Sequence, residues 1–251
     1  MSEPYFIDRI KLKSSVPDDS YLKSIPAVKY LEKAKELVFN SNVTIFTGEN
    51  GSGKSTLIEA IAVACGFNPE GGTKNYSFST NSTHSGLWER ITVSRKKRER
   101  DGYFLRAESF YNAATYLEEL DKIECAAPPV LNSYGGKSLH CRSHGESFMT
   151  LTETRFGSDG LYILDEPEAA LSPMKLMRLL VRIHELEQKG SQFIIATHSP
   201  ILMTYPSAEI LELSQSGIKG VDYSETEHYV LTRRFLEAPE RMYRYLFEED
   251  G

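Results

Sequence analysis

The chain has 251 residues and a hydrophobic content of 40%, which is enough apolar material for a sizeable core and excludes wholesale disorder. Lys and Arg number 29 and Asp and Glu number 35, so the net charge of −6 excludes a chain-wide basic surface for nucleic acid. The 3 cysteines do not make a disulfide framework, and no apolar run reaches the roughly 18 residues that a membrane span needs. The first residues also lack the basic-then-apolar order of a signal peptide. We therefore expect a cytoplasmic protein that does not interact with membranes.

Segments typical of strands and of helices alternate along the chain. Short runs of β-branched and aromatic residues predict strands, and apolar residues spaced three and four apart predict helices. We expect strands at 6–12, 43–47, 91–94, 103–106, 161–164, 192–197 and 210–213. We expect helices at 26–38, 57–65, 109–123, 147–154, 173–189 and 235–247. The dipeptide Asp101-Gly102 lies between two of these strands and predicts a β-hairpin there.

This order of elements predicts the fold class. Strand–helix alternation at both ends of the chain is typical of an α/β fold with a mostly parallel central sheet flanked by helices. The middle of the chain adds an antiparallel β portion and a helical insertion at about 107–158. We expect a single domain over residues 1–251.

A glycine-rich segment, GENGSGKST at 48–56, matches G-x-x-x-x-G-K-[ST] between a predicted strand and a predicted helix. Glycines let the backbone amides wrap a phosphate, and the helix N-terminus adds its positive end. We expect Lys54 to reach the β- and γ-phosphates of a nucleotide and the Ser55 hydroxyl to bind Mg²⁺. The predicted phosphate-binding residues are Gly48, Glu49, Asn50, Gly51, Ser52, Gly53, Lys54, Ser55 and Thr56.

Two adjacent carboxylates, Asp165 and Glu166, end a second apolar strand. Such a pair at a buried strand end is costly unless a cation lies nearby. Asp165 is suited to hold Mg²⁺ by way of water, and Glu166 is suited to polarise an attacking water molecule.

These two motifs resemble those of the ABC ATPase superfamily. Gly51 and Thr56 match the form of the phosphate loop common in that superfamily, and Asp165-Glu166-Pro167 followed by EAALSP resembles its Walker B strand and D-loop. The usual D-loop aspartate is replaced by Ser172. The resemblance implies a P-loop NTPase fold of ABC type and Mg²⁺-dependent hydrolysis of ATP to ADP and phosphate.

A third segment resembles a degenerate ABC signature. In Ser143-His144-Gly145-Glu146, Ser143 keeps the signature hydroxyl, Gly145 the close backbone approach, and Glu146 takes the place of glutamine. The resemblance implies that these three residues cap the γ-phosphate bound by a partner subunit, from within the inserted lobe. The alternative is local, because Ser143-x-x-Glu146 also fits a helix capping box.

The run ATHSP at 196–200 follows an apolar strand, and His198 resembles the switch histidine that contacts the γ-phosphate. A histidine with a purely structural role is the alternative. No glutamine occupies the segment 104–110, where the glutamine loop is expected, so Glu108 is the substitute metal ligand that we assign. Tyr21 and Tyr30 are candidates to stack on adenine.

The resemblance covers most of residues 40–215. It lies closest to small stand-alone bacterial ATPases, AAA family ATPases in the broad sense, near the SMC and recombination-repair branch. It implies an ATP-dependent homodimer with two nucleotides sandwiched head to tail, and DNA or an effector protein as a further partner in DNA repair or defence. Three alternatives stay open: a transporter ATPase subunit, a P-loop kinase, and a non-catalytic ATP clamp.

Two other features have less specific interpretations. The basic run at 95–100 fits either a phosphate-backbone contact or a solvated turn. The spacing of Cys125, His140, Cys141 and His144 fits no usual zinc pattern, so zinc is not expected.

Overall fold

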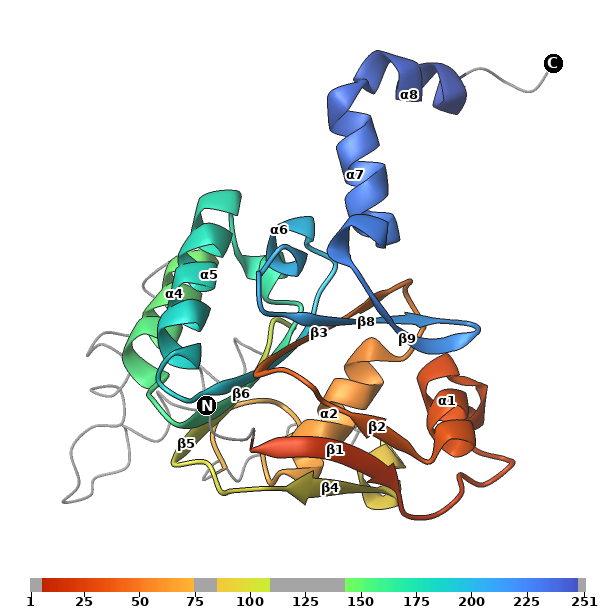
Figure 1. The fold of residues 1–251 in the computed structure, drawn as a ribbon, viewed down its shortest axis with the longest axis vertical. Helices are drawn as coiled ribbons and strands as arrows, with labels where there is room; N and C mark the ends of the chain where they lie inside the picture. Colours follow the sequence, from red (N-terminus) through yellow and green to blue (C-terminus); the bar gives the residue numbers. More distant parts are fainter. Residues whose placement is uncertain (1–5, 75–84, 109–142, 248–251) are drawn as a thin grey trace.

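The computed structural model describes residues 6–74, 85–108 and 143–247. Its fold contains two β-sheets (Figure 1). The larger sheet has six strands in the order β5-β6-β7-β3-β8-β9. Its first five strands are parallel, and β9 pairs antiparallel with β8. Their bounds are β5 Asp101–Arg106, β6 Gly160–Asp165, β7 Gln192–Ala196, β3 Val43–Gly48, β8 Glu209–Ser214 and β9 Gly217–Val221.

The smaller sheet is antiparallel, in the order β2-β1-β4. Its strands are β1 Ile7–Leu12, β2 Glu36–Val38 and β4 Ile91–Arg95. The α/β class, the mostly parallel central sheet and the antiparallel portion predicted from the sequence are confirmed.

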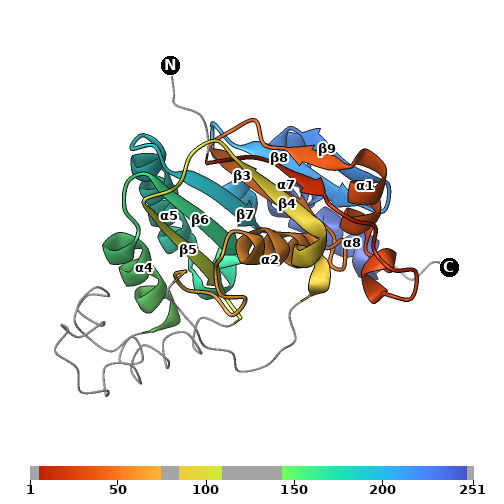
Figure 2. The ribbon, with the colours of Figure 1, turned by 90° about the horizontal axis from the view of Figure 1, so that it is seen from below.

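The two faces of the larger sheet pack against different helices (Figure 2). Along β6, Leu161 and Ile163 belong to an apolar cluster with α1 (Pro26–Ala34), α2 (Lys54–Ala64) and the smaller sheet. Tyr162 and Leu164 point the other way, into a cluster with α4 (His144–Arg155), α5 (Pro173–Glu187) and α6 (Pro200–Met203). Both faces of β6 are therefore buried, as is usual for parallel strands. The consequence for the site is that α2 and α4 lie on opposite faces of the sheet.

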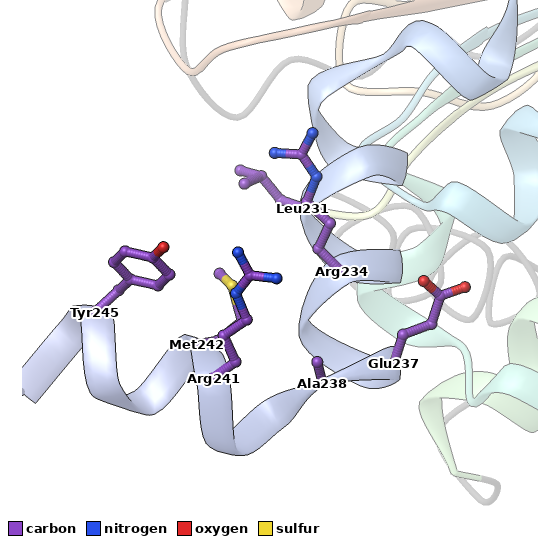
Figure 3. A pocket seen from close by; sticks show the side chains of 7 residues that line it. All are labelled: Leu231, Arg234, Glu237, Ala238, Arg241, Met242 and Tyr245. Carbon is purple, nitrogen blue, oxygen red and sulfur yellow. The ribbon is translucent and has the colours of Figure 1, made fainter.

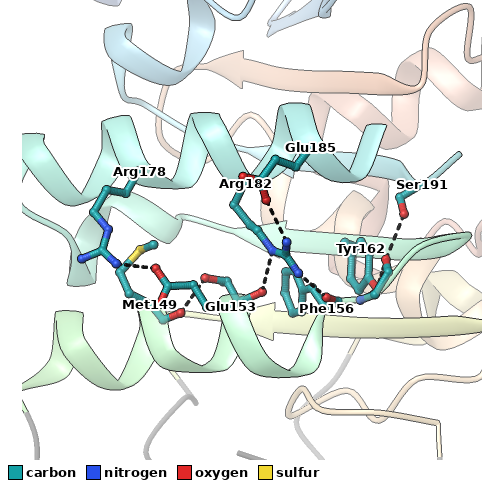
Figure 4. A network of polar contacts seen from close by, with 10 residues as sticks. Met149, Glu153, Phe156, Tyr162, Arg178, Arg182, Glu185 and Ser191 are labelled. Carbon is teal, nitrogen blue, oxygen red and sulfur yellow. Dashed lines mark hydrogen bonds and ion pairs between the residues drawn. The ribbon is translucent and has the colours of Figure 1, made fainter. Parts of the chain in front are cut away.

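A polar network fixes α4 against α5 (Figure 4). The Arg182 guanidinium donates to the carbonyl oxygens of Thr152, at 3.2 Å, and Phe156, at 2.6 Å, which lie at the end of α4. Arg178 on the same face of α5 pairs with Glu153 at 2.5 Å. Because carbonyls at a helix end have no intrahelical donor, Arg182 satisfies groups that the fold would otherwise bury unpaired.

The C-terminal helices α7 (Glu227–Glu237) and α8 (Pro239–Phe247) extend away from the sheets (Figure 1). They meet at an angle around a hollow of about 610 Å³ (Figure 3). Its lining consists of Leu231, Arg234, Glu237, Ala238, Arg241, Met242 and Tyr245. The single helix expected at 235–247 is therefore wrong, because Ala238 leaves helical geometry just before Pro239.

Two further expectations differ from the structure, and one strand has no counterpart among the expected elements. The helix expected at 26–38 ends at Ala34, because Lys35 adopts a left-handed φ of 67° and β2 follows. The expected hairpin is absent from the described residues, since β4 pairs with β1 whereas β5 pairs with β6 in the other sheet. Strand β9 was not expected. The predicted helix at 109–123 and most of the inserted lobe at 107–158 lie outside the described residues.

The basic run at 95–100 connects the two sheets. Arg95 pairs with Glu99 and donates to the carbonyl oxygen of Cys65 at 2.9 Å, and the Lys97 ammonium lies over the Phe6 ring. Of the candidate zinc residues, only His144 lies within the described part of the chain. No helix in that part is long and apolar enough to span a bilayer.

Candidate nucleotide site

The carboxyl ends of three neighbouring strands form the site. In the sheet, β7 lies between β3 and β6, and all three are parallel. The phosphate loop follows β3, Asp165 ends β6, and His198 follows β7 by two residues. Parallel order therefore gathers residues more than 100 positions apart at one edge, where ligands bind in open α/β sheets.

Left-handed backbone conformations shape the phosphate loop. Gly48, Gly51 and Gly53 have φ values of 130°, 79° and 98°. The Lys54 ammonium folds back on the loop and donates to the carbonyl oxygens of Gly48 at 2.8 Å and Glu49 at 2.9 Å. Burial lowers the pKa of Lys54, and nearby carboxylates oppose that shift. The lysine is thus held inside the loop as the cation that an incoming phosphate would meet.

Ser55 and Asp165 join the loop to β6. The Ser55 hydroxyl donates to Oδ1 of Asp165 at 3.1 Å. Burial raises the pKa of Asp165 to about 6, and Arg106 counteracts the shift with its Nε at 3.6 Å from Oδ2. Arg106 also pairs with Glu59 on α2 at 2.8 Å. The carboxylate is therefore buried next to one arginine and one hydroxyl, in a position where a cation would relieve its burial.

These oxygens fit Mg²⁺ better than a metal held by protein groups alone. Mg²⁺ prefers hard oxygen ligands and binds through one or two protein groups together with phosphates and water. Ser55 and Asp165 supply two such oxygens. In the described residues no group of three or more acidic, histidine or cysteine side chains could hold a metal by itself. Glu108 is 84% exposed and lies 3.7 Å from Arg106, so its assignment as a ligand stays a prediction.

Glu166 projects from the turn after β6. Its φ of 50° is left-handed, and its N–H donates to the carbonyl oxygen of Ala196 at 2.9 Å. This turn leaves the carboxylate partly exposed, with Oε1 at 3.6 Å from Nε2 of His198. The carboxylate and the imidazole therefore lie next to each other beyond the ends of β6 and β7.

His198 is anchored on two sides. Its backbone N–H donates to Oε1 of Glu168 at 2.6 Å, and its Nδ1 lies 2.9 Å from Nε2 of His228. Burial lowers the pKa of His198 to about 4, and the positive Lys54 adds to the shift. Nε2 of His198 and Oγ of Ser52 are buried with no hydrogen-bond partner among the described residues. Such orphaned groups beside a phosphate loop suit a polar ligand.

Ser143, Gly145 and Glu146 lie at the start of α4, across the sheet from α2. The capping box that the sequence offered as an alternative is formed: the Glu146 N–H lies 3.4 Å from Oγ of Ser143, and the Ser143 N–H donates to Glu146 at 2.9 Å. A Cβ on Gly145 would come within 2.7 Å of the carbonyl oxygen of Ala170. The structure thus gathers Lys54, the Ser55–Asp165 pair and the Glu166–His198 pair, and it packs the start of α4 against the segment that follows β6.

Three contributing residues were missed by sequence reasoning. Arg106 has no motif, and it reaches Asp165 because β5 pairs in register with β6. Glu168 lies inside the recognised run after β6, which was a usable signal. His228 lies on α7, and no motif in the neighbouring sequence indicated that it belongs to the site. Of the candidates to stack on adenine, Tyr21 is exposed and Tyr30 packs beside Gly217, and neither assignment is tested.

Comparisons with known proteins agree on the type of domain. A family model described as "AAA domain" matches residues 24–155, and a second, "AAA domain, putative AbiEii toxin, Type IV TA system", matches residues 148–204. The "Ribose import ATP-binding protein RbsA" of Jannaschia sp. is 23% identical over 215 residues, which cover 75% of this chain and 40% of that protein. The chain thus spans about two fifths of that relative.

Two further similarities cover most of the chain. The "Xylose/arabinose import ATP-binding protein XylG" of Sulfolobus acidocaldarius is 27% identical over 218 residues, which cover 78% of this chain and 82% of that one. A solved structure titled "Structure of ATP binding subunit of ABC transporter" aligns with a TM-score of 0.50 at 17% identity, covering 93% of this chain and 99% of that one. This structural similarity agrees with the fold.

Proposed function

This chain belongs to the AAA domain family of ABC-type P-loop ATPases, and from that premise we propose that it hydrolyses ATP with Mg²⁺ between two copies of itself. The observation that supports the proposal most is the meeting of Lys54, the Ser55–Asp165 pair and the Glu166–His198 pair at one sheet edge. Nucleotide binding follows from the family, whereas Mg²⁺, the dimer and the individual roles are the proposal.

The loop side chains bind and orient the phosphates. Lys54 exchanges the carbonyl oxygens of Gly48 and Glu49 for phosphate oxygens, which are stronger partners for an ammonium group. The amides of residues 48–56 and the N-terminus of α2 add donors around the same phosphates. Ser55 and Asp165 would hold Mg²⁺, which when bound neutralises charge that develops on the β- and γ-phosphates.

Glu166 and His198 act where water attacks. The Glu166 carboxylate accepts a hydrogen bond from the attacking water and orients it towards the γ-phosphate. His198, whose lowered pKa keeps it neutral near pH 7, donates from Nε2 to a γ-phosphate oxygen.

A second chain would complete the site. Because α4 packs on the face of the sheet opposite α2, we infer that Ser143, Gly145 and Glu146 serve the phosphate loop of a partner chain. The α4 N-terminus and the Ser143 hydroxyl would donate to the γ-phosphate held by the partner, with Glu146 beside them. Residue Ser172 follows the short helix Pro167–Ala170 and would lie along the same interface.

Phosphate release by purified chains tests this proposal. Glu166→Gln should lower the rate by about 100-fold or more, because a positioned base contributes that much, while ATP still binds. Glu153→Gln, which removes the same charge from the exposed face of α4, is the matched control and should retain the wild-type rate. Wild-type turnover by Glu166→Gln would refute the assignment.

The names of the relatives support one competing candidate, a transporter ATPase subunit. Both sugar-import relatives are ATP-binding proteins, and a transporter subunit would co-purify with a membrane protein. Against this, segment 104–110 lacks a glutamine and the signature is altered. We instead propose a role in DNA repair or defence. The description of the second family model supports the defence role. DNA retention by the ATP-bound Glu166→Gln chain, measured by electrophoretic mobility, distinguishes the two.

A further inference from the structure

The first turn of α7 reaches into the nucleotide site. Nε2 of His228, the second residue of this helix, lies 2.9 Å from Nδ1 of His198 and 3.5 Å from the carbonyl oxygen of Gly48. The two rings meet edge to face, with centroids 4.7 Å apart and planes at 87°. His228 therefore touches both the predicted γ-phosphate sensor and the first residue of the phosphate loop.

The position of His228 is set by the start of its helix. Thr226, directly before α7, is fully buried, and its hydroxyl donates to the carbonyl oxygen of Tyr223 at 2.7 Å and lies 3.6 Å from the sulfur of Met203 on α6. A hollow of about 570 Å³ next to this turn is lined by Gly48 and Glu49 of the loop and by Glu227 and Val230 of α7. The start of α7 is thus packed against the body, whereas its far end and α8 are not.

The surroundings determine which nitrogen carries the proton between the rings. The contact at 2.9 Å requires one proton between Nδ1 of His198 and Nε2 of His228. The carbonyl oxygen of Gly48, 3.5 Å from Nε2 of His228, can only accept, so a proton on that nitrogen suits both neighbours, whereas a bare nitrogen would face the oxygen with its lone pair. Nδ1 of His198 then accepts, which leaves the His198 proton on Nε2.

The other side of the His198 ring agrees with that assignment. Its Nε2 faces Oε1 of Glu166 at 3.6 Å, and a carboxylate favours an N–H there. The lowered pKa keeps the ring neutral near pH 7, so only one of its nitrogens carries a proton. The charged and titratable groups around the ring are Lys54 from α2, Glu166 and Glu168 from the segment after β6, and His228 from α7.

We propose that His228 is a positioning residue that holds His198 as its Nε2–H tautomer, with the N–H directed to the place of the γ-phosphate. The inference rests on the proposed function, in which His198 contacts that phosphate. Without a donor at Nδ1, only Glu166 at 3.6 Å would favour the proton on Nε2, and His198 would populate both tautomers. It follows that the first turn of α7 is part of the nucleotide site.

Nitrogen-15 NMR of the full chain labelled at histidine tests this without ATP. His198→Gln identifies the signals of His198 among the 6 histidines. In the wild type we expect a protonated Nε2 and a bare Nδ1 in His198. In His228→Leu we expect a mixture of tautomers, and in His228→Gln, whose amide nitrogen can replace the Nε2 donor, we expect a return towards the wild-type pattern.

The kinetic readout separates positioning from folding. His228→Leu should lower single-turnover hydrolysis by about 10-fold, as is common for residues that orient a reacting group, with ATP affinity changed less than twofold, and His228→Gln should recover most of the rate. A protonated Nδ1 of His198 in the wild type would overturn the inference, as would an unchanged tautomer in His228→Leu. If His228→Leu does not fold, the wild-type spectrum and His228→Gln still decide. Absence of hydrolysis in the wild type would instead refute the proposed function.

Discussion

Substituting Gly48 tests how the phosphate loop is joined to the sheet. Gly48 ends β3 opposite Leu213 of β8, and a Cβ there would come within 2.0 Å of the Leu213 carbonyl oxygen. Its φ of 130° also lies beyond the left-handed region that other residues occupy. Backbone strain costs about 1–2 kcal/mol and a forced overlap about 1–3 kcal/mol. Gly48→Ala should therefore lower the free energy of unfolding by about 3 kcal/mol.

Gly51 provides the matched comparison within the same loop. Its φ is 79°, and a Cβ would have no atom within 4 Å, so Gly51→Ala meets only the strain of about 1 kcal/mol. Urea unfolding without nucleotide measures both variants, and the midpoints should differ while the slope stays constant. The reasoning fails if Gly48→Ala is no more destabilised than Gly51→Ala.

Three further predictions concern other parts of the molecule. Arg182→Ala should lower the free energy of unfolding, measured in urea, by about 2 kcal/mol, because two carbonyls at the end of α4 lose their donor. Arg178→Ala on the same helix should lower it by less than about 1 kcal/mol, and equal losses would contradict the role given to the network. The pKa of His198 falls from 6.5 to about 4 on folding, so the unfolded chain binds more protons between these values and the protein loses stability as the pH falls through that range. The free energy of unfolding in urea should therefore fall from pH 7 to pH 5 by about 1 kcal/mol more in the wild type than in His198→Gln. An identical fall in both proteins would contradict this prediction. Burial raises the pKa of Cys65 to about 11, so its thiol should react slowly in the folded chain. In a variant that lacks the other two cysteines, a thiol reagent at pH 8 should label the folded chain at least about 10-fold more slowly than the unfolded chain, and equal rates would show that the thiol is accessible.

The sequence predicted the parts of the site that are local in the chain. The phosphate loop, Asp165 and His198 each follow a short apolar strand, and parallel pairing places such strand ends at one edge. That inference needs only the order of the elements and not their exact contacts. The same reasoning located β1, β3, β6, β7 and β8 to within a few residues.

Residues that reach the site through tertiary packing could not be predicted. Arg106 contacts Asp165 only because β5 joins β6, whereas the dipeptide Asp101-Gly102 favoured a local hairpin. Pairing with β6 buries Tyr103, Phe104 and Leu105 on both faces of the larger sheet, which outweighs a turn preference. His228 likewise reaches the site only because the buried Thr226 fixes the start of α7, and β8 and β9 separate it from His198 along the chain.

The molecular mass of Glu166→Gln in solution tests the two-chain account most directly. Light scattering with and without Mg-ATP measures whether the mass of 28.4 kDa doubles, with Mg-ADP as the control because it lacks the γ-phosphate that the second chain would contact. We expect one chain alone or with Mg-ADP and two chains with Mg-ATP. A chain that binds Mg-ATP and keeps the mass of a single copy would contradict the account.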